Sequence, residues 1–111
     1  MSEIKEKEIN DSEDGSGNGS ENRFSGEFEI VNKLGLHARA AVIFVKAAGK
    51  FESEITITKD DMEINGKSIM GILMLGAAMG TNITVVAKGS DAERAVRELG
   101  NLILNKFGEE Q

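Results

Sequence analysis

The sequence predicts an α+β domain in which helices cover one face of an antiparallel sheet and the other face is open to water. Segments with alternating apolar and polar residues indicate four strands, and segments with apolar residues three or four positions apart indicate three helices. These elements follow one another in the order β-α-β-β-α-β-α. A chain of 111 residues is about the size of one domain, so all of them are expected to share one core.

The N-terminal part of the chain differs from the rest in composition. Residues 11–20 include no apolar side chain and consist of glycine, serine, asparagine and acidic residues. Such a segment cannot bury enough surface to offset the entropy lost on ordering, so we expect residues 1–23 to form a disordered acidic extension. We interpret it as a solubilising extension, with a specific docking tail as the alternative. The domain itself is assigned to residues 24–111.

The first half of the domain is predicted to be a strand, a loop and a helix. Residues 27–32 alternate well enough for a strand, and residues 33–36 form a loop with a glycine hinge. Residues 38–50 are predicted to be helical, with an end at Gly49. The apolar residues at helical spacing are Ala38, Ala41, Val42, Val45 and Ala48.

The second half begins with a hairpin, in which strands 54–59 and 62–65 are joined by a turn of two aspartates. Ser68 is a good N-cap for a short helix that stops at Gly76, and residues 82–88 form a β-branched strand. Ser90 and Glu93 have the spacing of a capping box. The last helix carries apolar residues at helical spacing up to Lys106, and Gly100 weakens it by about 1 kcal/mol unless packing uses the gap.

Composition excludes several kinds of site. The chain has no cysteine and one histidine, which excludes disulfides, thiolate nucleophiles and the common zinc sites within one chain, and we expect no metal and no cofactor. It has no apolar run long enough to span a bilayer and no secretory signal, so we expect a soluble, cytoplasmic protein without membrane insertion. Most of the net charge of −6 lies in the extension, and the nearly balanced domain gives no indication of nucleic-acid binding.

The single histidine, His37, directly precedes a predicted helix and has Arg39 two residues after it. The first turn of a helix has N–H groups without internal partners, and its dipole favours an anion. A neutral imidazole can attack a phosphoryl group, and a guanidinium can stabilise the transferred charge. The pattern therefore favours phosphoryl transfer through His37. The alternative is a histidine that only caps the helix or lies on the surface.

The short helix after Ser68 is apolar around most of its circumference. A helix that lies on a sheet buries one side, so some of these side chains should face water and form a surface for a partner. The alternative is a helix enclosed in the core. Ser68 has a structural role as N-cap worth about 1 kcal/mol, and a role as a phosphorylation site needs support from outside the local pattern. The apolar residues are Ile69, Met70, Ile72, Leu73, Met74 and Leu75.

Two motifs together, Gly35-Leu36-His37-Ala38-Arg39 and Asn65-Gly66-Lys67-Ser68-Ile69-Met70-Gly71-Ile72-Leu73, resemble the HPr family, the histidine phosphocarriers of the bacterial phosphotransferase system. The resemblance runs from about Phe24 to Phe107 and implies an open-faced β-sandwich. It also implies that His37 accepts phosphate at Nδ1 from enzyme I, which phosphoenolpyruvate charges, and donates it to an A-type permease component or a regulatory relative. Such a protein is a stoichiometric carrier rather than an enzyme, and we expect a monomer.

The resemblance also implies roles for further residues. Arg39 matches the active-site arginine of the family, and Ser68 matches the serine that an ATP-dependent kinase modifies in many bacteria, which a phosphatase would reverse. Ile69, Met70 and Leu73 match the helix on which partners dock. Ala40 departs from the family, which usually has proline there, and we expect phosphate holding to survive with a looser first turn.

Two other functions remain open. One is a carrier of the nitrogen-related regulatory branch, whose members resemble the chain around residues 32–37 and 73–75. The other is a binding module that acts through Ser68 and its helix while His37 is idle. The acidic extension has no role that the resemblance explains.

Overall fold

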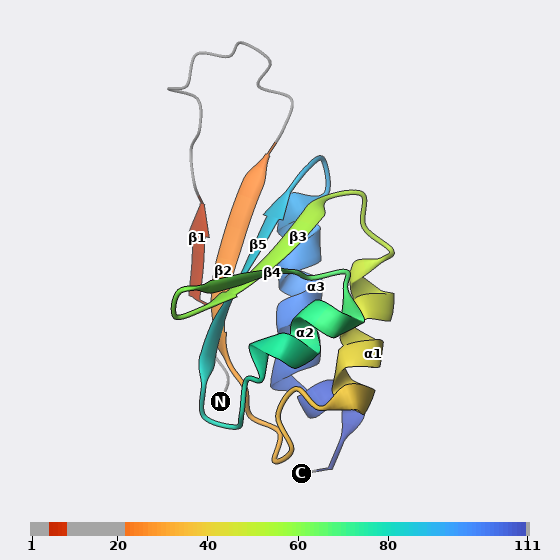
Figure 1. The fold of residues 1–111 in the computed structure, drawn as a ribbon. Coiled ribbons are helices and arrows are strands. Elements are labelled where there is room, and N and C mark those ends of the chain that lie inside the picture. The colour runs from red at the N-terminus through yellow and green to blue at the C-terminus, as the bar shows by residue number, and fades with distance from the viewer. Residues whose placement is uncertain (1–4, 9–21, 111) are drawn as a thin grey trace.

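The computed structural model describes residues 5–8 and 22–110, with backbone alone at the first four of these (Figure 1). Its elements are β1 (Lys5–Glu8), β2 (Arg23–Glu29), α1 (Ala38–Ala48), β3 (Glu54–Lys59), β4 (Met62–Asn65), α2 (Ile69–Leu75), β5 (Asn82–Lys88), α3 (Ala92–Leu104) and a 3-10 turn, η2 (Lys106–Gly108). The predicted strands at 54–59, 62–65 and 82–88 have the bounds that the sequence indicated. The first strand of the domain lies earlier than predicted, at 23–29 rather than 27–32.

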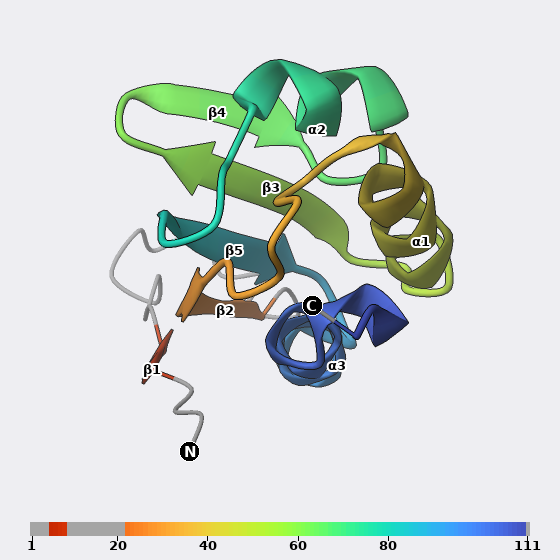
Figure 2. The same cartoon turned by 90° about the horizontal axis from the view of Figure 1, so that it is seen from below.

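The strands form one antiparallel sheet in the order β1-β2-β5-β3-β4. Ile57 of β3 lies opposite Val85 of β5 and Ile64 of β4. On β5, buried and half-buried residues alternate, so one face of the strand enters the core. Figure 2 shows the sheet as one layer and α1, α2 and α3 on the same side of it. The predicted α+β class, with one sheet face covered by helices, is confirmed.

The sheet has one strand more than the four predicted. The four expected strands are adjacent as β2-β5-β3-β4, and β1 pairs along the outer edge of β2, with Lys5 opposite Glu27. Disorder was expected throughout residues 1–23, and β1 and the start of β2 at Arg23 differ from that expectation. An edge strand exposes unpaired backbone groups, and pairing with them requires no apolar side chain. Residues 1–4 and 9–21, on which the rest of that prediction falls, lie outside the described residues.

Helix α1 buries only part of the predicted stripe, because Ala41 and Ala48 are buried and Val45 is half-buried. The buried residues are Ala40, Ala41, Phe44 and Ala48, whereas Ala38 and Val42 are exposed. The helix ends at Ala48 with Gly49 as C-cap, which confirms the predicted stop signal. Phe44 is the largest buried side chain on this helix, and the side of the helix that carries it faces the core.

The predicted capping box at α3 is wrong. The N-cap residue is Asp91, and no side-chain hydrogen bond caps the helix. The Asp91 carboxylate instead accepts hydrogen bonds from the backbone N–H groups of Glu52 and Ser53, both at 3.0 Å, and from the Ser53 hydroxyl at 2.5 Å. The start of α3 is thereby tied to the segment before β3. The hydrogen bond from the Ser53 hydroxyl, followed by that from Glu52, lowers the pKa of Asp91.

Gly100 allows α3 to pack closely on the sheet. A Cβ at this position would lie 2.2 Å from Cε1 of Phe28, whose ring is buried in the core. The phenyl ring therefore occupies the space that the missing side chain leaves. This is the packing that the sequence analysis named as able to offset the cost of a glycine inside the helix.

Candidate functional site

A tight loop precedes His37 and positions it at the start of α1. Gly35 has φ +66°, and a Cβ there would lie 2.6 Å from the carbonyl oxygen of Ala77, so the turn requires glycine. The N–H of Leu36 donates to the same carbonyl at 2.9 Å. His37 is extended, with φ −82° and ψ −179°, and its carbonyl accepts from the N–H of Ala41 at 2.9 Å. It is thus the N-cap residue, but its ring makes no capping hydrogen bond and is available for other contacts.

The first turn of α1 offers a favourable place for an anion beside the imidazole. The turn has no acidic residue, and the N–H groups of a first turn lack intrahelical partners. Arg39 is exposed within this turn, and its charge contributes to lowering the pKa of Glu109. Ala40 is fully buried and the helix begins at Ala38 without a proline. The looser first turn expected from Ala40 stays a prediction.

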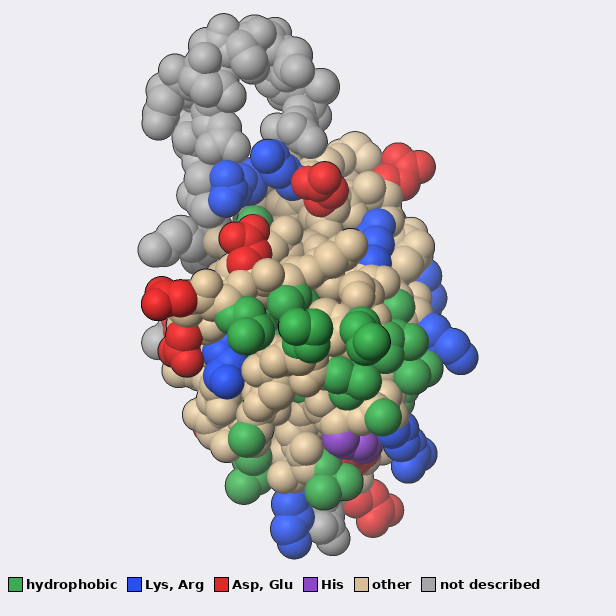
Figure 3. All heavy atoms as spheres, viewed as in Figure 1, with side chains coloured by type: hydrophobic (Ala, Val, Ile, Leu, Met, Phe, Trp, Pro, Cys, Tyr) green, Lys and Arg blue, Asp and Glu red, His purple; other side chains and the backbone are tan. Residues whose placement is uncertain are grey.

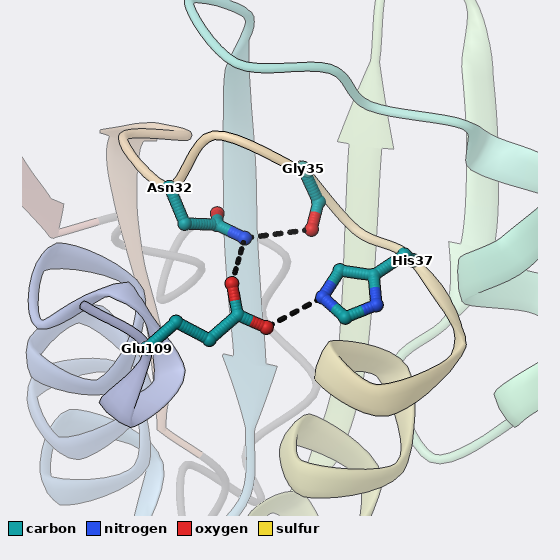
Figure 4. A network of polar contacts seen from close by, with 4 residues as sticks. All are labelled: Asn32, Gly35, His37 and Glu109. Atoms are coloured by element: carbon teal, nitrogen blue, oxygen red, sulfur yellow. Dashed lines mark hydrogen bonds and ion pairs between the residues drawn. The ribbon is translucent and has the colours of Figure 1, made fainter. Parts of the chain in front are cut away.

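The sequence reasoning missed two residues that contact or support His37. Nε2 of His37 lies 2.5 Å from Oε2 of Glu109. The other oxygen of that carboxylate accepts a hydrogen bond from Nδ2 of Asn32 at 3.0 Å, and the same Nδ2 donates to the carbonyl oxygen of Gly35 at 2.8 Å (Figure 4). Asn32 is fully buried, whereas the side chains of His37 and Glu109 are 28% and 13% exposed. The four residues form one network at the molecular surface.

An unusual backbone brings Glu109 to this network. After α3 the residues Lys106, Phe107 and Gly108 have φ of +61°, +55° and +83°. Residues other than glycine are strained by about 1–3 kcal/mol in this region and remain there only where surrounding contacts hold them. Phe107 is buried in the core, and the N–H of Glu109 donates to the carbonyl of Lys106 at 2.8 Å. The chain therefore turns back toward the start of α1.

Opposing effects set the pKa of Glu109. Burial raises it, but hydrogen bonds from Asn32 and His37, followed by the charges of His37 and Arg39, outweigh burial and leave the pKa below its ordinary value of 4.5. The carboxyl is therefore ionised at neutral pH. No local pattern around Glu109 indicated this contact, because 72 residues separate it from His37. The only signal for Asn32 was its place in residues 32–37, the segment that resembles the nitrogen-related branch.

The exposed apolar side chains of α2, the helix that Ser68 caps, lie on the same face of the molecule as the histidine (Figure 3). The Ser68 hydroxyl accepts from the N–H of Gly71 at 3.0 Å, which confirms the predicted N-cap, and Gly76 ends the helix with φ +62°. Ile72 and Leu75 are buried, whereas the other four apolar side chains of the helix are exposed, so the alternative of a fully enclosed helix is wrong. We call the exposed set the apolar patch: Val42, Ile69, Met70, Leu73 and Met74, which are 36%, 40%, 70%, 40% and 68% exposed.

The described part of the chain has neither a metal-ligand cluster nor a membrane-spanning helix. Over residues 22–110, whose side chains the structure describes, no group of three or more histidine and acidic side chains is placed to hold a metal ion. Within the same part of the chain no helix has the length and apolar character needed to cross a bilayer.

Comparisons with known proteins agree with this geometry. The family model described as "PTS HPr component phosphorylation site" matches residues 24–105. Phosphocarrier protein HPr of Neisseria meningitidis serogroup A is 53% identical over 81 residues, which are 73% of this chain and 91% of that protein. Phosphocarrier protein NPr of Shewanella violacea is 44% identical over 80 residues, 72% of this chain and 88% of the relative. The crystal structure of HPr-C-His from Thermoanaerobacter tengcongensis has a TM-score of 0.76 and 48% identity, and the match covers 78% of this chain and 98% of that one.

Proposed function

The chain belongs to the HPr family, the phosphocarriers of the phosphotransferase system, and we propose that it carries the phosphoryl group on His37. One observation carries the assignment of the residue: His37 is the N-cap of α1, with an exposed Arg39 in the first turn and no acidic side chain there. This environment favours a dianionic group attached to the ring.

The proposed transfer uses Nδ1 of His37 as the nucleophile. A bond forms between Nδ1 and the phosphorus carried by enzyme I, the bond between that phosphorus and enzyme I breaks, and its electron pair remains on enzyme I. Arg39 and the first-turn N–H groups offset the charge of the phosphoryl oxygens. The same sequence of events then passes the group to an A-type permease component. His37 is regenerated at the end, so the protein is a stoichiometric carrier rather than an enzyme.

Both partners are proposed to dock on the apolar patch, chiefly through Ile69, Met70 and Leu73. Each partner has to approach His37, and the patch is the exposed apolar surface of α1 and α2 beside it (Figure 3). Methionine side chains adapt to surfaces of different shape, which suits a carrier that meets two partners in turn. We propose that the carrier acts as a cytoplasmic monomer.

Regulation is proposed to act through phosphorylation of Ser68 by an ATP-dependent kinase and reversal by a phosphatase. The Ser68 hydroxyl is half-buried at the start of α2, next to Ile69 in the sequence. A phosphate would add about −1.5 to −2 charge at the border of a surface that a partner has to desolvate. The fold need not change for such a modification to oppose docking.

A second function keeps the phosphoryl chemistry and changes the partners. The NPr of Shewanella violacea is 44% identical to the chain, which supports a carrier of the nitrogen-related branch as the alternative. The third candidate, a binding module with an idle His37, has less support because the imidazole contacts an ionised carboxylate and adjoins Arg39.

The proposal is tested by ³¹P NMR of the full chain incubated with phosphoenolpyruvate, magnesium and a bacterial enzyme I. We expect an acid-labile phosphoramidate signal that is absent from a His37→Ala variant. No signal with an enzyme I that phosphorylates another HPr would contradict the carrier function and favour the binding module. Comparison of A-type acceptors from the sugar and nitrogen branches then separates the first two functions.

A further inference from the structure

We propose that Glu109 is a positioning residue that determines which nitrogen of His37 receives the phosphoryl group. The inference rests on the proposed carrier function and adds to it a role for a residue near the end of the chain. Glu109 acts through the ring and not on the phosphoryl group itself. The observation behind it is the contact of 2.5 Å between Oε2 of Glu109 and Nε2 of His37.

An ionised carboxylate decides the tautomer of a neutral imidazole that contacts it. The carboxylate can only accept hydrogen bonds, so Nε2 has to carry the proton in this contact. A neutral ring then has its free lone pair on Nδ1, which Figure 4 shows on the side of the ring away from Glu109. Nδ1 is thereby left as the nucleophile, and attack through Nε2 would first require the carboxylate to leave.

Asn32 holds the carboxylate in this orientation. Its Nδ2 donates to Oε1 of Glu109 at 3.0 Å and to the carbonyl of Gly35 at 2.8 Å, so both amide hydrogens are used and the second oxygen is directed at the ring. Asn32 is fully buried and has little freedom to turn away. Gly35 belongs to the loop that delivers His37, so the same amide connects the carboxylate to the backbone beside the imidazole.

The contact also suits the charge that the transfer creates. When Nδ1 of a neutral ring takes the phosphoryl group and Nε2 keeps its proton, the ring becomes cationic and the phosphoryl group is a dianion. Glu109 lies beside the cationic edge of the ring, while Arg39 and the first-turn N–H groups are available to the dianion. The positive and negative charges of the product thus each have a partner of opposite sign.

The first test uses the unphosphorylated full chain and ¹⁵N NMR of the His37 ring at alkaline pH, where imidazole is neutral. We expect the Nε2–H form alone in the wild-type chain. Glu109→Gln and Glu109→Ala should each show a measurable Nδ1–H population, because the acceptor-only partner is gone. The matched control is Glu110→Gln, which removes an equal charge from the neighbouring exposed residue and should leave the wild-type tautomer. Thermal unfolding verifies that the variants are folded.

The second test measures phosphoryl transfer from enzyme I to the same variants. We expect kcat to fall by about tenfold in Glu109→Gln, the low end of the loss that follows when the hydrogen-bond partner orienting a metal-bound imidazole is removed. KM should be unchanged, because Glu109 is outside the apolar patch. A wild-type tautomer in both Glu109 variants would overturn the inference, even if their rates fell. A changed tautomer with an unchanged kcat would also overturn it.

The two proposals fail in different ways. If the wild-type chain takes no phosphate from enzyme I, the carrier function is wrong, whatever the tautomer. If the wild-type chain is phosphorylated but the Glu109 variants match it in tautomer and rate, the carrier function holds and the positioning role is wrong.

Discussion

His37 and Glu109 are in contact at 2.5 Å although 72 residues separate them in the chain. The contact joins the start of α1 to the segment that follows α3, and Asn32 connects both to the loop before His37. The end of the described chain is therefore part of the histidine site (Figures 1 and 4). Removing residues 105–111 would thus alter the site as well as the core, because Phe107 is buried.

Glu109 makes the stability of the fold depend on pH. Its pKa is lower in the folded chain than its ordinary value of 4.5, so the contribution of the carboxylate is present above that value and is lost as the pH falls through the folded value. At pH 7 we expect Glu109→Gln to reduce the free energy of unfolding by about 1 kcal/mol, which is less than the ~1.5–3 kcal/mol of a buried charged hydrogen bond because water reaches the pair. Urea unfolding at pH 7 and at pH 3 checks this. Equal differences at both pH values would contradict the assignment.

Asp91 is expected to show the same sign of pH dependence at another place in the fold. Its pKa is lowered chiefly by the Ser53 hydroxyl and the Glu52 N–H, so its stabilising effect is present above 3.8 and disappears as the pH falls below it. Asp91→Asn should lower the thermal midpoint at pH 7 and much less at pH 2.5. Asp61→Asn, in the exposed turn before β4, is the control and should have little effect at either pH.

Gly100 should not tolerate a methyl group. Alanine would improve the helix propensity of α3 by about 1 kcal/mol, but its Cβ would lie 2.2 Å from Cε1 of Phe28. We expect Gly100→Ala to destabilise the fold by about 1–3 kcal/mol, since the buried ring and helix would have to separate. Asn101→Ala, at the exposed adjacent position of the helix, should be neutral or slightly stabilising. Urea unfolding of the two variants measures the contrast, and a stabilised Gly100→Ala would contradict the packing argument.

Two substitutions of Ser68 separate its structural role as N-cap from its proposed regulatory role. Ser68→Ala loses the N-cap hydrogen bond to Gly71 and should cost about 1 kcal/mol of stability, with phosphoryl transfer retained. Ser68→Asp keeps an N-cap acceptor and adds a charge beside the apolar patch, so it should remain stable while KM for transfer from enzyme I rises by about tenfold. Thermal unfolding and transfer kinetics measure the two effects. A normal KM in Ser68→Asp would count against regulation through docking.

Local patterns in the sequence determined most of the secondary structure. The strands at 54–59, 62–65 and 82–88, the N-cap at Ser68 and the stop at Gly76 are all confirmed. Side-chain alternation, capping and left-handed glycine conformations depend on residues only a few positions apart, so they can be recognised without the fold. The motifs around His37 and Ser68 were likewise readable, and the family that they indicated is the one to which the chain belongs.

Tertiary structure alone decided the contacts between distant segments. The side of α1 that is buried depends on how Phe44 packs in the core. The Asp91 carboxylate accepts hydrogen bonds from the segment before β3 instead of capping its own helix. The strand at Lys5–Glu8 depends on the free edge of β2. Glu109 reaches His37 because buried Phe107 holds a strained turn after α3. These features result from packing and hydrogen bonding across long sequence separations, where the periodicity of a local segment contains no information.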